Sequence, residues 1–362
     1  MIRIGIDARE LVGETTGTGR YLGELVTRWA ARPDANRREL ILYTPEPLPI
    51  AQAFPASARL REVVCGSGRG TWWEQTHLRR AVRSDPPDVF FAAAYTAPLA
   101  LGIPLALSVH DVSFAAHPEW FRPTEGARRR LITRQAARRA RLVFTFSEFS
   151  KGEIVDRLGV AAERVFIVHH GVTQRRIAEG SREPLVLYAG SIFNRRRLPS
   201  AIAAFAAATA EMPEARFVIA GADRTYPAVD LAEAARQAGV ADRVDIRSYV
   251  SEAELTSLYS RASACVFLSE YEGFGLTPLE ALAAGVPAVV LDTPVAREIY
   301  GAAACYVDPA DDVRQAARAL KLLLTRPDEA TRQVAAARAV LARYSWESAA
   351  AATLAAIEKV AE

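Results

Sequence analysis

A chain of 362 residues, half of them apolar and 24% charged, has enough material for two hydrophobic cores, and this composition excludes a disordered protein. No apolar run approaches the length of a membrane span, and the charged start MIRIGIDARE lacks the apolar stretch of a signal peptide. We therefore expect a cytoplasmic protein. Its three cysteines, Cys65, Cys265 and Cys305, form no metal or redox motif.

The two halves of the chain differ in charge. Residues 1–180 carry 26 lysines and arginines against 19 acidic residues, a net charge of +7, whereas the remainder carries 19 against 23. An electropositive first half favours an anionic partner such as a phospholipid surface or a lipid phosphate. We expect no nucleic acid, because no DNA-binding or RNA-binding signature accompanies the arginines.

Short β-branched runs alternate with amphipathic or Ala/Arg-rich stretches in the first half of the chain. This βαβα rhythm predicts a parallel sheet covered by helices. In chain order the expected strands and helices are Ile2–Asp7, Tyr21–Ala31, Leu40–Tyr43, Trp72–Val82, Val89–Phe91, Leu105–Val109, Thr124–Ala140, Leu142–Phe146, Glu148–Leu158 and Val165–Val168.

A polar stretch from His169 to Pro184 then precedes a second series of the same kind, and we expect this stretch to be a hinge. The sequence predicts an α/β protein with two facing, Rossmann-like doubly wound domains. The expected domains are residues 1–170 and 183–345, with residues 346–362 as a helix that packs back on the first domain. The strands expected in the second series are Leu185–Ala189, Phe217–Ala220, Val244–Ile246, Cys265–Leu268 and Ala288–Leu291, with helices between them.

Ligands of such sheets bind outside the carboxyl ends of the strands, so the loops after apolar runs are the places to search. Residues 269–287, with the sequence SEYEGFGLTPLEALAAGVP, follow one strand and open a helix. Gly273 and Gly275 let the backbone approach a ligand, and Pro278 suits a first helical turn. The N–H groups at this helix start form an anion site.

Two carboxylates, Glu272 and Glu280, bracket that helix start. A diphosphate could lie between them, while one carboxylate accepts hydrogen bonds from sugar hydroxyls and the other from ribose hydroxyls. The alternative interpretation is a helix with an acidic first turn that follows a glycine loop.

Three consecutive arginines, Arg195 to Arg197, follow the strand Leu185–Ala189. Basic groups at the carboxyl end of a strand can neutralise a diphosphate as charge builds on it. The alternative is a solvated basic loop.

A glycine turn precedes the first expected helix, with the sequence TGTGR over residues 16–20. It resembles the start of a dinucleotide fingerprint, but the third glycine would fall at Leu22 and the loop begins some ten residues after the first strand. A nicotinamide cofactor is therefore disfavoured.

One histidine also lies at a strand end. His110, with Asp111 after it, closes the run Leu105–Val109, whereas a lone histidine is more often structural.

Taken together, these segments resemble the retaining glycosyltransferases of the GT-B fold, especially the large bacterial family numbered four. The pair Glu272 and Glu280 has the spacing of that family's E-x7-E signature. Other segments also resemble sequence motifs of that family. These are IGIDAR over residues 4–9, the glycine turn, His110-Asp111, SEFS over 147–150 and SWE over 345–347. The resemblance covers nearly the whole chain.

The resemblance implies roles for particular residues. His110, Glu272 and Arg196 would act at the reaction centre, with Arg196 in place of the usual lysine. The first domain would bind the acceptor and the second the nucleotide sugar, and Tyr249 and Val250 would border the nucleobase. Donor-binding residues would be Gly17, Gly19, Arg195, Arg196, Tyr249, Val250, Gly273, Phe274, Gly275, Leu276, Thr277 and Glu280.

The acceptor side is less defined. Trp73-Glu74-Gln75 and residues 95–98 resemble segments that line it, with helix packing and a turn as equal alternatives. A basic helix with apolar residues, residues 128–141, could rest on an anionic membrane or form a solvated face.

The expected activity is transfer of a hexose from a GDP- or UDP-sugar to a glycan or a polyprenyl-diphosphate-linked acceptor, in cell-surface polysaccharide synthesis. Family resemblance implies retention of configuration. We expect no cofactor and no metal, because arginines stand where a divalent ion would. The alternatives are a sugar epimerase or phosphorylase, a nicotinamide dehydrogenase and a non-catalytic nucleotide-sugar binding protein.

Overall fold

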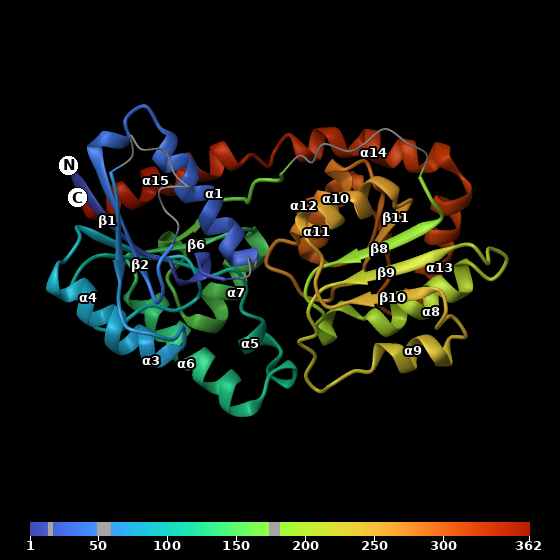
Figure 1. The fold of residues 1–362 in the computed structure, drawn as a ribbon, viewed down its shortest axis with the longest axis horizontal. Helices are drawn as coiled ribbons and strands as arrows, with labels where there is room; N and C mark the ends of the chain where they lie inside the picture. The colour runs from blue at the N-terminus through green and yellow to red at the C-terminus, as the bar shows by residue number, and fades with distance from the viewer. Residues whose placement is uncertain (14–16, 49–58, 174–181) are drawn as a thin grey trace. The chain divides into compact units, whose positions relative to one another are not determined.

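Parallel strands alternate with helices along the chain and form two separate sheets (Figure 1). The computed structural model describes residues 1–13, 17–48, 59–173 and 182–362. These residues divide into two compact units. Unit 1 comprises Met1–Ala116, Thr124–Gly171 and Ser345–Glu362, and unit 2 comprises His117–Pro123 and Val172–Tyr344.

Unit 1 is built on a seven-stranded parallel sheet with the strand order β3-β2-β1-β4-β5-β6-β7. Its inner strands are buried on both faces, which explains their nearly continuous apolar sequences. The strands are β1 (Ile2–Asp7), β2 (Arg38–Thr44), β3 (Leu60–Val64), β4 (Val89–Ala92), β5 (Leu105–Ser108), β6 (Leu142–Thr145) and β7 (Val165–Ile167).

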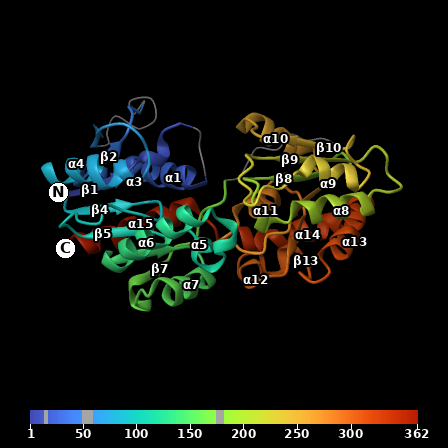
Figure 2. The ribbon, with the colours of Figure 1, turned by 90° about the horizontal axis from the view of Figure 1, so that it is seen from below.

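Helices cover both faces of this sheet. Right-handed crossovers place the helix between β1 and β2 on one face, and the helices before β4, β6 and β7 on the other. Figure 1 shows α1 and α15 opposite α3, α4 and α6, and Figure 2 shows α3, α6 and α7 following one another across their face. The helices are α1 (Gly17–Ala31), α3 (Thr71–Trp73), the π-helical turn η3 (Glu74–Leu78), α4 (Arg79–Ser84), α5 (Ser113–Ala116), α6 (Pro123–Arg139), α7 (Glu148–Leu158) and α15 (Trp346–Ala361).

The last helix, α15, belongs to unit 1 although the residues before it belong to unit 2. It contacts α1, β4, β5 and β6. The buried indole of Trp29 donates a hydrogen bond to the carbonyl of Ala350 over 2.8 Å. Trp346 lies against Gly171 so closely that a Cβ on Gly171 would meet its ring at 2.3 Å.

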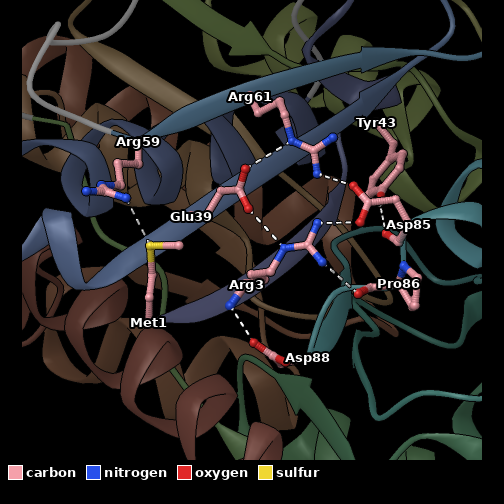
Figure 3. Close-up of polar contacts among 9 residues, drawn as sticks. All are labelled: Met1, Arg3, Glu39, Tyr43, Arg59, Arg61, Asp85, Pro86 and Asp88. Atoms are coloured by element: carbon pink, nitrogen blue, oxygen red, sulfur yellow. Dashed lines mark hydrogen bonds and ion pairs between the residues drawn. The ribbon is translucent and has the colours of Figure 1, made fainter.

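Alternating charges tie the amino ends of β1, β2 and β3 together (Figure 3). Arg3 and Arg61 each pair with Glu39 over 3.0 Å and with Asp85 over 2.6 Å. Each carboxylate therefore bridges both guanidinium groups. This ring lies at the amino ends of the strands, whereas the ligand sites of such sheets lie at the carboxyl ends.

Unit 2 is built on a six-stranded parallel sheet with the order β10-β9-β8-β11-β12-β13. The strands are β8 (Leu185–Ala189), β9 (Arg216–Ala220), β10 (Val244–Arg247), β11 (Ala264–Phe267), β12 (Ala288–Leu291) and β13 (Cys305–Val307). The helices are α8 (Leu198–Ala208), α9 (Leu231–Gln237), α10 (Glu252–Arg261), α11 (Leu276–Ala283), α12 (Pro294–Tyr300), α13 (Asp312–Thr325) and α14 (Pro327–Leu341).

The predicted fold class, two Rossmann-like doubly wound α/β sheets, is confirmed. The prediction missed β3 and β13. Leu60–Val64 contains Arg61 and Glu62, and Cys305–Val307 has three residues, so neither carries a long apolar run, and both strands lie at sheet edges. Of the expected hinge His169–Pro184, residues 174–181 lie outside the described residues. Across the described ranges, we find no helix with the length and apolar character needed to span a bilayer.

Candidate active site

The strand order of unit 2 reverses at β8, because β9 lies on one side of it and β11 on the other. The loops after β8 and β11 therefore leave the same edge of the sheet in different directions, which is where doubly wound sheets bind ligands. The first loop carries Arg195 and Arg196, and the second carries Glu272 and the start of α11.

Glu272 lies where the two loops meet. Its Oε1 accepts hydrogen bonds from the Ser269 hydroxyl over 2.5 Å and from Nη2 of Arg196 over 3.0 Å. Nε of Arg195 lies 3.7 Å from the same oxygen. The side chain is 13% exposed, so the carboxylate is fixed by three groups and still reaches the surface.

Arg196 carries donors that are not used. Its guanidinium stacks over the ring of Phe267 at 4.3 Å, and its Nε and Nη1 are buried without a hydrogen-bond partner among the described residues. The hydroxyl of Tyr188, which borders this guanidinium, donates to the carbonyl of Ser191 over 2.8 Å. A buried donor without a partner is costly, which indicates that this site is built for an anionic ligand.

The three consecutive arginines have different surroundings. Arg195 is buried, with its guanidinium 4.4 Å from the centre of the Phe193 ring. Arg197 has a left-handed backbone with φ 48° and turns away, toward Glu270, Asp312 and the carbonyl of Pro309. Only Arg195 and Arg196, of the three, have an ion pair with Glu272.

Helix α11 starts beside the end of β8. Gly275 has the left-handed φ of 87° and its carbonyl accepts a hydrogen bond from the buried Tyr300 hydroxyl over 2.9 Å. The hydroxyl of Thr277 donates to the carbonyl of Ala189, the last residue of β8, over 3.0 Å. This contact fixes the first N–H groups of α11, from Leu276 onward, beside the loop that holds Arg196.

The remaining predicted residues of this segment lie around the helix start. Phe274 is buried, and its ring packs edge-on against Tyr344 at 5.2 Å. Glu280 lies one turn into α11 and is 8% exposed. Burial, with a smaller contribution from the charge of Glu280, raises the pKa of the Cys265 thiol to about 12. Gly273 precedes Phe274 in the same loop.

A close approach of two backbones supports the loop after β8. A Cβ on Gly221 would lie 2.0 Å from the carbonyl oxygen of Gly190, and both glycines have positive φ. Glycine is therefore needed at these two strand ends.

Tyr249 and Val250 lie apart from this cluster in the order of the sheet. They follow β10, which is separated from β8 by β9. Tyr249 is 66% exposed.

In unit 1, His110 follows β5 and is surrounded by aromatic rings. Its Nε2 lies 2.8 Å from the carbonyl oxygen of Ala93, so Nε2 carries the proton and Nδ1 is the acceptor. The ring centres of Phe146 and Tyr21 lie 4.7 and 5.2 Å from that of His110. Burial lowers the pKa of His110, which keeps the imidazole neutral at pH 7.

The predicted glycine turn opens helix α1. Gly17 is the first residue of α1, and a Cβ there would have no described residue within 4 Å, its chain neighbours and its own helix aside. Packing therefore gives no reason for glycine at this position, whereas Gly19 is buried. Residues 14–16, with Thr16 of the predicted turn, lie outside the described residues.

A buried ionic cluster lies at the carboxyl end of β1, and it includes Glu74 and Thr96, which belong to the two segments that resemble the acceptor side. Nε of Arg9 donates to both carboxylate oxygens of Asp7, over 3.0 and 2.9 Å, and its Nη2 contacts Glu74. Glu74 also accepts from the Thr96 hydroxyl over 2.5 Å. The position of Asp7 at the end of a strand is the signal that could have found it, but 65 residues separate Arg9 from Glu74.

The structure thus brings Arg195, Arg196 and Glu272 together with the start of α11 in unit 2, and it places Gly17, Gly19 and His110 in unit 1. Within the described ranges, no group of three or more His, Cys, Asp or Glu side chains is arranged to hold a metal ion.

Comparison with solved structures identifies the fold. The chain superposes on sucrose-phosphate synthase from Thermosynechococcus elongatus with a TM-score of 0.77, 16% identity and 99% of each chain covered. It superposes on Anabaena HepE in complex with UDP-glucose with a TM-score of 0.76, 17% identity, and 98% and 100% covered. At this identity the likeness defines the fold alone, and that fold is GT-B.

Two family models match consecutive parts of the chain. Residues 15–176 match Glycosyltransferase Family 4, and residues 173–340 match Glycosyl transferases group 1. The chain therefore belongs to the GT-B glycosyltransferases of the family-4 type, and the resemblance seen in the sequence is confirmed.

Two curated relatives illustrate the range of the family. The O-antigen chain mannosyltransferase RfbU of Salmonella typhimurium is 28% identical over 227 residues, 62% of each chain. The GDP-mannose:cellobiosyl-diphosphopolyprenol alpha-mannosyltransferase of Komagataeibacter xylinus is 35% identical over 194 residues, 52% of this chain and 49% of the relative. The matched part thus spans 62% of the first relative and 49% of the second.

Proposed function

We propose that this protein transfers a hexose from a nucleotide-diphosphate sugar to a glycan or a polyprenyl-diphosphate-linked acceptor in cell-surface glycan synthesis, with retention of configuration and without a metal. The observation that carries the proposal is Arg196, whose buried Nε and Nη1 have no partner among the described residues beside the start of α11. Two unpaired donors and a helix start form a site for a diphosphate.

In the proposed reaction the bond between the anomeric carbon and the diphosphate oxygen breaks as the acceptor oxygen attacks from the same face. The acceptor's proton passes to the departing diphosphate, so the step needs no protein base. Arg195, Arg196 and the first N–H groups of α11 stabilise the charge that grows on the leaving group. Glu272, fixed by Ser269 and the arginines, orients the sugar and supports its positive character.

Other residues hold the donor. Glu280 binds the ribose hydroxyls, Tyr249 and Val250 border the base, and Gly17 and Gly19 give the sugar and phosphates close backbone contact. His110 contacts the sugar as a neutral imidazole, with its Nδ1 as acceptor. Each of these roles is proposed from the family resemblance and the position of the residue.

The two curated relatives are named as mannosyltransferases, and one is named for GDP-mannose and a diphosphopolyprenol acceptor. The solved HepE complex holds UDP-glucose. The proposal for this chain therefore keeps both GDP- and UDP-linked hexoses as donors and favours GDP-mannose because the relatives share more sequence.

The test begins with a thermal-shift screen of GDP-mannose, UDP-glucose, UDP-galactose and the free diphosphates, since a ligand that binds the folded state raises the apparent stability. The donor that binds is then incubated with the enzyme, with and without a lipid-linked saccharide acceptor. Release of nucleoside diphosphate supports a transferase. Conversion of the donor into an epimer, or binding without turnover, would refute it.

Stereochemistry and metal use are tested on the same reaction. An α-linked donor should give an α-linked product, read from the one-bond coupling between the anomeric carbon and its proton in the NMR spectrum. Turnover should persist in a chelator, because arginines neutralise the leaving group. A β-linked product, or a strict need for magnesium or manganese, would contradict these two parts of the proposal.

A further inference from the structure

Two neighbouring side chains at the start of the π-helical turn η3 hold one loop of unit 1. Gln75 accepts a hydrogen bond from the N–H of Leu99 over 3.0 Å and donates to the carbonyl of Ala97 over 3.1 Å. Glu74, which is 1% exposed, accepts from the hydroxyl of Thr96 over 2.5 Å. Both side chains therefore hold the loop that leaves the carboxyl end of β4, at the edge of the sheet where ligands bind.

The backbone is unusual on both sides of this contact. Glu74 begins the π-helical turn, and such turns are rare and frequently lie at functional sites. In the loop, Tyr95 has a left-handed φ of 56°, an outlier for a bulky side chain that persists only where the surrounding structure enforces it. The hydrogen bonds from Glu74 and Gln75 to the residues after Tyr95 supply that enforcement.

The support behind the two side chains is buried and ionic. Both carboxylate oxygens of Glu74 are occupied, Oε1 by the Gln75 amide and Oε2 by Arg9 and the Thr96 hydroxyl. Arg9 is itself buried and is paired with Asp7. Because removal of one partner would leave a buried charge uncompensated, the cluster holds Glu74 and Gln75 in one orientation.

The same loop contacts His110 on two sides. The carbonyl of Ala93 accepts the proton of His110 Nε2 over 2.8 Å, and the ring of Tyr95 packs against the imidazole with ring centres 5.4 Å apart. The Tyr95 hydroxyl donates to Asp111, the residue after His110, over 3.0 Å. Since a carbonyl oxygen can only accept, the proton stays on Nε2 for as long as the loop keeps its shape.

From these contacts we propose that Glu74 and Gln75 are positioning residues for His110. They hold the loop of residues 93–99 in the shape that keeps the imidazole protonated on Nε2 and presents Nδ1 as the acceptor. The importance of that acceptor for sugar transfer rests on the proposed function, in which His110 contacts the donor sugar. The tautomer does not rest on it, because it is a property of the free protein.

The test replaces Gln75 and reads His110 directly. Gln75→Met keeps the size of the side chain and removes both hydrogen bonds to the loop. The imidazole nitrogens of the wild type and the variant are compared by nitrogen NMR at neutral pH without ligand, and His110→Gln assigns the signal among the five histidines. We expect one neutral tautomer with the proton on Nε2 in the wild type, and exchange between the two tautomers in the variant.

Gln333 provides a matched control on unit 2. Its side chain also binds one backbone N–H and one carbonyl, both of Ala288, over 3.0 and 3.2 Å. Gln333→Met should lower the unfolding temperature about as much as Gln75→Met, but it should leave the tautomer of His110 unchanged.

Kinetics with the donor identified above separate positioning from stability. We expect kcat of Gln75→Met to fall roughly 10- to 100-fold with the donor KM nearly unchanged, because a misplaced group at the reaction centre costs up to about a hundredfold in rate. In Gln333→Met both constants should be near those of the wild type. If Gln75→Met does not fold, Gln75→Glu takes its place, since it keeps the acceptor for the Leu99 N–H and loses the donor to Ala97.

Two results would overturn the proposal. One is an unchanged His110 tautomer in a folded Gln75 variant, because the loop would then keep its shape without Gln75. The other is an equal loss of kcat in the Gln75 and Gln333 variants, which would make the effect one of stability alone. A wild-type protein without turnover would instead contradict the proposed function, and the NMR comparison would still decide whether Gln75 positions His110.

Discussion

Arg196 and Arg197 are neighbours in sequence, but the structure predicts opposite consequences of replacing them. Nε and Nη1 of Arg196 have no partner in the part of the chain that the structure describes, whereas Arg197 contacts Glu270, Asp312 and the carbonyl of Pro309. Arg196→Ala should therefore impair the reaction, and Arg197→Ala should impair the fold.

The size of the effect follows from those contacts. Two charge-assisted hydrogen bonds contribute roughly 1.5–3 kcal/mol each, and loss of one preorganised donor typically costs on the order of a hundred- to a thousand-fold in rate. We expect kcat of Arg196→Ala to fall by about a hundred- to a thousand-fold, because the hydrogen bonds from Arg196 strengthen as the diphosphate leaves. Affinity for the free diphosphate should also fall.

The assay is steady-state release of nucleoside diphosphate at saturating donor, with rates normalised to folded protein. Arg197→Ala is the matched control, since it removes the same charge one residue away. Its Tm should fall by a few degrees while kcat stays within about twofold. The reasoning would be refuted by Arg196→Ala with a near-normal kcat, or by equal loss of kcat in both variants.

Three further predictions concern the other buried groups. Glu272→Gln should mainly lower kcat, since it removes charge beside the sugar, whereas Glu280→Gln should mainly raise the donor KM; a reversed pattern in steady-state kinetics would exchange their proposed roles. His170 is buried, with its ring stacked on those of Phe146 and His110. Burial and neighbouring histidines hold the pKa of His170 well below 6.5, so the unfolded state takes up the proton first as pH falls. The free energy of unfolding should then decrease below pH 6.5 by up to about 1.4 kcal/mol per pH unit, and His170→Gln should reduce that slope in urea titrations at pH 7.5 and 5.5. Gly171→Ala should destabilise the protein, because its Cβ would lie 2.3 Å from the Trp346 ring. An unchanged midpoint of urea unfolding would contradict this, since it would mean that Gly171 and Trp346 can move apart at no cost in free energy.

Strands were predictable from the sequence where they are buried on both faces. Leu185–Ala189 is buried throughout and was predicted with its observed bounds. Leu60–Val64 was missed because an edge strand keeps contact with water and tolerates charge in its middle, here Arg61 and Glu62. An apolar run in the sequence indicates a buried strand, and strands at the edges of a sheet are less buried.

For the candidate site, the sequence indicated which loops to search but not which of their side chains contact one another. Glu272 and Arg196 were each predicted from a strand end, and they meet because β11 pairs with β8, a neighbour from much earlier in the chain. The different orientations of Arg196 and Arg197 depend on the left-handed backbone of Arg197. The sequence does not indicate this conformation, because arginine rarely adopts it. The sequence indicated the segments of Glu74 and Thr96 but not their contacts with Arg9, because 65 residues separate Arg9 from Glu74.

The position of α15 has a consequence for synthesis on the ribosome. Unit 1 begins with the first strand, but α15 follows all of unit 2 in the chain and covers α1 and three central strands. Residues Val172–Tyr344 can fold as soon as they emerge, since domains generally fold as units during translation. The nascent first unit cannot be completed until α15 has been synthesised, so the apolar face around Trp29 stays uncovered while about 180 further residues are added. At typical elongation rates this takes roughly 10 to 40 seconds. Chaperones that bind exposed apolar surface would therefore meet this chain at its first unit, and a premature stop before Ser345 would leave that surface open permanently.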